Sequence, residues 1–142
     1  MQARLDQTMI EQSLMRAAEE IGDIAPAVMA RFYERFAAAR DVFAQHGTPS
    51  PDQLEGRMVE NVLYCMLHWL ESPGEIRTLF WDSVPHHAQS LGIPPEHFVG
   101  FLVAVAQVIG DRIPADQDEE RRCWGLLEAE LRAAIEQACR TG

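Results

Sequence analysis

Apolar residues recur at intervals of three and four along most of this chain, which is the spacing of amphipathic helices. The first such run covers residues 9–21. Thr8 and Glu11 form a capping-box sequence at its start, because a hydroxyl and a carboxylate there can each bind an unpaired amide of the first turn. Gly22 follows the last apolar residue and is typical of a helix end. We therefore predict a helix capped by Thr8.

Two longer apolar runs follow. The first has Pro26 in its first turn, where the missing N–H costs little, and its helical pattern continues without a break through residues 27–43. A segment rich in Gly and Pro predicts a loop over residues 44–52. Pro51 then falls at the first position of a long helix, whose apolar residues run from Leu54 to Leu70.

Three further helices are predicted in the second half of the chain. They cover residues 76–91, where Pro85 is expected to kink or restart the helix, 93–113, and 119–140, which begins with acidic residues. No segment alternates with the two-residue period of a strand, and no internal repeat occurs. The pattern predicts an all-α fold of about six to seven helices, forming a single domain over residues 1–142.

Composition and charge narrow the classes of partner. The sequence is 47% hydrophobic and 24% charged, has a formal net charge of −10 and contains no lysine. An acidic surface repels phosphate, which disfavours binding to nucleic acid or an anionic membrane. Neither a membrane span nor a signal peptide is indicated, so a cytoplasmic protein is expected. The cysteines (Cys65, Cys123 and Cys139) lack metal-ligand spacing and are expected to be reduced thiols.

The stretch VPHHAQSLGIPPEHF, residues 84–98, contains three of the five histidines. His87 lies near the predicted end of one helix, and PPEHF opens the next after a break at Gly92. Histidine in an apolar helical setting is more often structural than a ligand, so this arrangement alone leaves both interpretations open. His86 is expected to face solvent, and His97 to cap a helix or cross its surface.

This corner resembles the proximal corner of the globins, and other phrases extend the resemblance along most of the chain. RFYERF (31–36), RDVF (40–43) and CWGLLEAEL (123–131) are similar to segments of bacterial single-domain globins and of the haem domain of flavohaemoglobins. The resemblance implies a globin-like fold that holds haem b, with His87 as the axial ligand of the iron. A diatomic gas (O2, NO or CO) would bind on the opposite side.

The resemblance also implies which other residues would surround the haem and the gas. On the distal side, the family's usual spacing gives Met58 with Val62 one turn later, whereas a three-residue shift in register would give Glu55. Tyr33 would donate its hydroxyl proton to the gas. The implied cofactor-binding residues are His87, Phe43, Met58, Val62, Tyr33 and Phe98.

Departures from the flavohaemoglobin pattern bear on function. Phe98 stands where a tyrosine partner of the proximal histidine is expected, and Glu128 stands where a second tyrosine is common. Losing these partners weakens electron donation by the histidine. No reductase domain follows, which argues against a self-sufficient nitric-oxide dioxygenase. The expected role is gas binding, sensing or detoxification. The chain could act as a monomer or as a homodimer. The alternatives are a haem-less interaction or sensor module and a haem dioxygenase with a separate reductase.

Overall fold

The computed structural model describes residues 4–41, 51–90 and 95–141, including every side chain in these ranges except those of residues 51, 52, 84–90, 95 and 141. Residues 39–41 are also helical, and the described ranges contain no strand. The helices with defined bounds are α1 (Gln7–Ile21), α2 (Ala25–Arg35), α4 (Pro51–His68), α5 (Pro73–Ser90), α6 (Pro95–Gly110) and α7 (Asp118–Thr141). The predicted all-α class is confirmed, and the arrangement is consistent with a globin-like fold.

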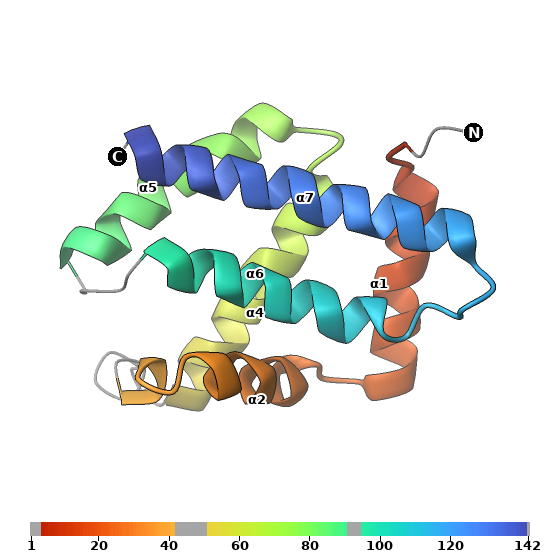
Figure 1. Cartoon of the computed structure of the whole chain (residues 1–142), viewed down its shortest axis with the longest axis horizontal. Coiled ribbons are helices and arrows are strands. Elements are labelled where there is room, and N and C mark those ends of the chain that lie inside the picture. Colours follow the sequence, from red (N-terminus) through yellow and green to blue (C-terminus); the bar gives the residue numbers. More distant parts are fainter. Residues whose placement is uncertain (1–3, 42–50, 91–94, 142) are drawn as a thin grey trace.

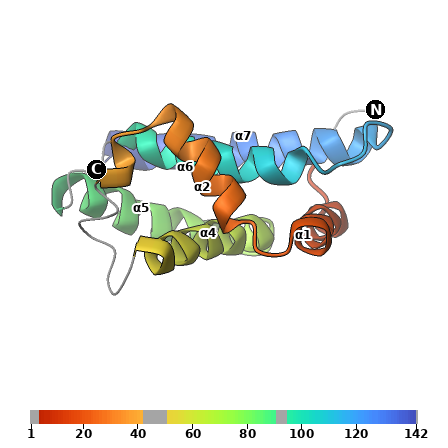
Figure 2. The same cartoon turned by 90° about the horizontal axis from the view of Figure 1, so that it is seen from below.

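The helices form two layers. α6 and α7 run side by side along the length of the molecule, while α1, α4 and α5 lie in the layer that faces them (Figures 1 and 2). α7 packs against α5, α6 and α1, and α2 packs across α6. Figure 1 shows α1 at one end of the long axis and α5 at the other. The buried core therefore centres on α6 and α7, with a different environment at each end.

Several predicted helix starts are confirmed. α4 begins at Pro51, and α6 begins at Pro95 within the phrase PPEHF. α7 begins with Asp118, Glu119 and Glu120 in its first turn, where negative charge complements the helix dipole. In the described part of the chain, no helix has both the length and the apolar character needed to cross a membrane.

Three local predictions were wrong. Asp6, not Thr8, caps α1: its side chain accepts a hydrogen bond from the Met9 amide, and its own amide lies 3.4 Å from Cys123 Sγ on α7. α5 is continuous through Pro85, so the alternative of a restart at that proline was wrong. The predicted helix over residues 27–43 is interrupted, since α2 ends at Arg35.

The end of α2 has a tertiary cause. Phe36 leaves the helical region, with φ −129° and ψ 68°, and its ring lies against the backbone of α6 at Gly100. A Cβ atom on Gly100 would lie only 2.2 Å from Phe36 Cε2. Only glycine leaves room for the ring at this position, so the helix break and the glycine belong to one packing arrangement.

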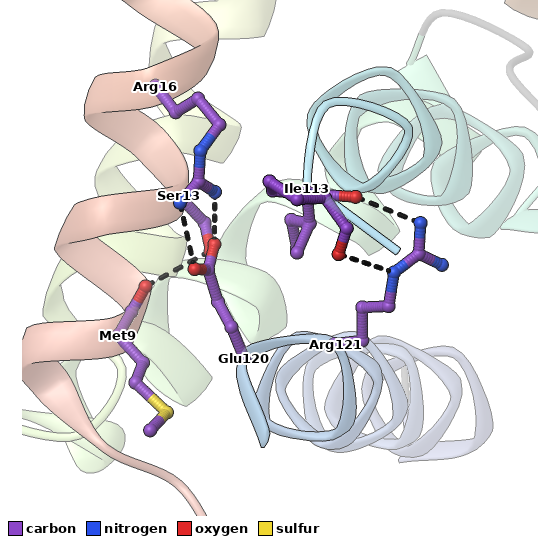
Figure 3. Close-up of polar contacts among 7 residues, drawn as sticks. Met9, Ser13, Arg16, Ile113, Glu120 and Arg121 are labelled. Atoms are coloured by element: carbon purple, nitrogen blue, oxygen red, sulfur yellow. Dashed lines mark hydrogen bonds and ion pairs between the residues drawn. The ribbon is translucent and has the colours of Figure 1, made fainter. Parts of the chain in front are cut away.

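A buried polar network joins α1 to α7 (Figure 3). Glu120 is buried; its carboxylate accepts hydrogen bonds from Arg16, one of them 3.0 Å long, and lies 2.7 Å from the Ser13 hydroxyl. Ser13 shares its single proton between this carboxylate and the Met9 carbonyl, 3.0 Å away. The Arg16 hydrogen bond, with help from Ser13, holds the pKa of Glu120 below its ordinary value despite burial. Glu120 therefore stays ionised and fixes α1 against α7.

Candidate functional site

A cavity of about 250 Å³ lies between α4, α5 and α6, at the end of the molecule away from α1. α2 and α7 each contribute one residue to its wall. Most of the lining is apolar, and several of these side chains belong to the buried core. The apolar lining residues are Phe32, Met58, Val62, Leu79, Phe80, Phe98, Phe101, Leu102 and Ile135.

Among the described residues, the polar side chains of the lining carry no acidic group, and the only basic one is an imidazole. They are Asn61, Tyr64, Cys65, Ser83 and His97. Burial raises the pKa of the Cys65 thiol to about 11, so it remains protonated at neutral pH. The interior thus offers neutral hydrogen-bonding groups on an otherwise apolar surface.

The cavity opens to solvent between α4 and α5. Three of its lining residues are exposed, namely Asn61 and Tyr64 on α4 and Leu79 on α5. The Tyr64 hydroxyl donates a hydrogen bond of 2.8 Å to Glu75 on α5, which links the two helices beside this opening. That hydrogen bond to a carboxylate raises the pKa of Tyr64, so the phenol keeps its proton.

His97, near the start of α6, reaches the cavity. Its ring lies 4.6 Å from the Phe36 ring and meets Phe32 edge-on at 6.1 Å, both measured between centroids. No described residue forms a hydrogen bond with its ring nitrogens. Desolvation lowers the pKa of His97, because burial penalises the charged imidazolium more than the nearby Glu96 stabilises it. The expectation that His97 caps a helix or crosses its surface did not place this side chain at the cavity, which it helps to line.

Tyr33 and Glu55 form a pair next to the cavity. Tyr33 is buried, and its hydroxyl lies 2.5 Å from Glu55 Oε2, to which it donates its only proton. The Arg40 guanidinium sits 4.4 Å from the centre of the tyrosine ring. Neither Tyr33 nor Glu55 lines the cavity. To donate to a ligand in the cavity, Tyr33 would first have to release Glu55.

The residues implied by the globin resemblance fall into three groups. Met58, Val62 and Phe98 line the same cavity. Tyr33 lies beside it, bound to the alternative distal residue Glu55. Phe43 and the side chain of His87 lie outside the described residues, although α5 carries the His87 backbone three residues before its last residue, Ser90.

Sequence reasoning missed His97 as a cavity residue. One signal was present: His97 and Phe101 are four residues apart, so they lie on the same face of α6. Because Phe101 is deeply buried, that face points inward at its start as well. Glu128, by contrast, is half-buried on α7 and does not line the cavity, and burial raises the pKa of its carboxyl group.

The described lining residues are chemically suited to a haem, since they are apolar and aromatic and include a neutral imidazole. The cavity, however, encloses only part of a haem. Pockets for drug-sized ligands measure about 300–1,000 Å³, and a porphyrin is a large ligand of that class. A haem would also need space toward the last turns of α5. Among the described residues, no group of three or more His, Cys, Asp or Glu side chains could hold a bare metal ion.

Comparisons with known proteins add no relative. The chain matches no protein-family model, no curated protein and no solved structure.

Proposed function

We propose that this chain is a globin-type haem protein that binds a diatomic gas, with His87 as the axial ligand of haem b. One observation supports the proposal above the others. Met58, Val62 and Phe98, which the resemblance assigns to the haem pocket, come from two different helices and line one apolar cavity. Met58 and Val62 share one face of α4 by helical spacing, so the position of Phe98 on α6 is the part of this match that depends on the tertiary structure.

Each of these pocket residues would have a separate role. Haem iron would supply the centre at which the gas binds, and the His87 imidazole would hold that iron from the end of α5. Met58 and Val62 would keep the gas side dry, since both side chains are apolar and neither can donate a hydrogen bond. Phe98 would pack against the proximal side. Gas binding, sensing and detoxification all use this arrangement, and detoxification would need a separate reductase.

A haem-less ligand-binding or sensor module is the second candidate, and two observations favour it. The described cavity is smaller than a porphyrin requires, and the hydroxyl proton of Tyr33 is already donated to Glu55. Both features suit a cavity that receives a smaller molecule.

The absorption spectrum of protein expressed with haem supplied tests the first candidate. We expect a Soret band that disappears in His87→Ala and survives in the neighbouring control His86→Ala. A colourless protein that takes up no added haemin would contradict the proposal. A band lost equally in both variants would contradict the choice of His87.

The role of Tyr33 is tested by gas release from the haem-loaded protein. Tyr33→Phe removes one hydrogen bond, so oxygen should dissociate several-fold faster if that hydroxyl reaches the gas. Glu55→Gln is the matched variant, because it replaces the carboxylate that accepts the Tyr33 hydrogen bond by a weaker acceptor. The Tyr33 hydroxyl would then be released more easily to the gas, and oxygen release should be slower. Equal rates in all three proteins would reject a role for Tyr33.

A further inference from the structure

Several side chains that line the cavity are held in place by the core, without any cofactor. Phe32, Phe101, Leu102 and Ile135 come from α2, α6 and α7 and are all buried in the core. These side chains are held by packing on the side away from the cavity, so they do not need a ligand to keep their positions. A hollow with such walls is preformed for a ligand that matches its size.

Its volume sets the size of that ligand. An apolar protein cavity of about 150 Å³ can hold a benzene molecule. The present cavity, at about 250 Å³, has room for a fused two-ring molecule such as indole, but not for a large macrocycle. The opening at Tyr64 and Leu79 gives such a molecule a route from solvent.

The lining chemistry sets the polarity of the ligand. A charged molecule would lose its hydration and find no side chain of opposite charge in the described lining, which makes its entry costly. A neutral molecule loses little, and a single polar group on it can find a partner in His97. His97 faces the cavity, and no described residue forms a hydrogen bond with its ring nitrogens. Its imidazole can therefore accept or donate one hydrogen bond to a ligand.

We propose that the cavity binds a small, uncharged aromatic molecule of about the size of indole, with His97 as the polar contact that determines specificity. This binding requires no haem and thus goes beyond the globin proposal. Phe32 and Phe36, which flank the His97 ring, hold the imidazole in place beside the ligand. The ligand's hydrogen-bonding group would point toward α6, and its apolar rings would fill the space next to Val62.

Three probes of similar shape test the proposal by titration calorimetry on haem-free protein. We expect indole to bind with a Kd on the order of 100 µM. Indene, which lacks the N–H group, should bind roughly five-fold more weakly. Indole-3-carboxylate should not bind, because it is charged. Absence of indole binding at about ten times that Kd, or equal binding of all three probes, would overturn the proposal.

Two pairs of variants locate the site. Val62→Phe fills the cavity and should weaken indole binding more than ten-fold, whereas Val99→Phe, a half-buried valine outside the cavity, should not. His97→Phe keeps a ring but should abolish the preference for indole over indene, and His68→Phe should preserve it. An unchanged preference in folded His97→Phe would overturn the role of His97.

Haem uptake is read separately from the Soret band. A protein that binds indole and takes up no haemin supports this inference and contradicts the globin proposal. A protein that takes up haem, but whose haem-free form is folded and binds no indole, overturns this inference and leaves the globin proposal standing.

Discussion

The two ends of the molecule treat buried polar groups in opposite ways. At the α1–α7 junction, the Glu120 carboxylate is answered by Arg16 and Ser13, so every polar atom there serves to hold two helices together (Figure 3). At the other end, the His97 imidazole lies at a hollow between α4, α5 and α6, and no described residue forms a hydrogen bond with it. The difference teaches that a polar side chain in the core is structural where protein groups meet it and available for binding where they do not.

Breaking the junction should have the largest effect on stability. Glu120→Ala leaves the Arg16 guanidinium without its buried partner, and we expect the free energy of unfolding to fall by about 2–3 kcal/mol, because Arg16 is partly exposed and can regain some hydration. Urea denaturation followed by circular dichroism measures this loss. Glu119→Ala, an exposed neighbour, is the control and should change stability by less than about 0.5 kcal/mol. Similar losses in both variants would show that the junction is not a special point.

The contact between Phe36 and Gly100 should have the next largest effect on stability. Gly100→Ala places a Cβ atom 2.2 Å from the Phe36 ring, which must move away, and we expect a loss of about 1–3 kcal/mol. Because Phe36 supports His97, indole binding should weaken in the same variant. Gly125→Ala meets no atom within 4 Å in the middle of α7 and should instead raise stability by up to about 1 kcal/mol. A stable Gly100→Ala protein would mean that the ring is not fixed there.

The smallest expected effect is the dependence of stability on pH at the cavity. The pKa of His97 is lowered by desolvation from its ordinary value of 6.5, so the folded protein resists protonation there more than the unfolded chain does. Stability should therefore fall as the pH decreases below 6.5, and this contribution should be missing in His97→Phe. Urea midpoints of both proteins between pH 7.5 and about 5 would test it. Parallel curves would contradict a desolvated imidazole.

The junction has a pH dependence of the same sign but at lower pH, because the pKa of Glu120 is also lowered. Glu120 has a pKa below the ordinary value of 4.5, so it stabilises the fold above that pH and loses its contribution as the pH falls through its lowered pKa. Its loss begins near the ordinary value of 4.5, below the series from pH 7.5 to about 5, so Glu120 contributes little to the change measured there.

Part of the candidate site could be predicted from the sequence. The resemblance to the globins assigned Met58, Val62 and Phe98 to one pocket, and all three line the cavity, from α4 and from the start of α6. The partner of Tyr33 could not be predicted in this way. Helical spacing shows that a residue faces inward, but it does not show which residue of another helix lies opposite, and here that residue is Glu55.

The same limit explains the errors in the helix boundaries. Asp6 and Thr8 are both good capping residues, and contact with Cys123 on α7 favours the first. The residues around Phe36 are compatible with a helix, and the chain leaves the helix there because the ring fits against Gly100 on α6. Each choice depends on a segment that is distant in sequence.

By itself, the sequence determined the all-α class, the approximate helix ranges and the inward faces, because these follow from local spacing and from residues that start or stop helices. Only the tertiary structure decided that Glu120 accepts hydrogen bonds from Arg16 and that Tyr33 donates one to Glu55. It also decided that His97 faces the cavity. The physical reason is that packing between helices sets which polar groups meet, and an unfilled space is a property of several helices together that no single segment encodes.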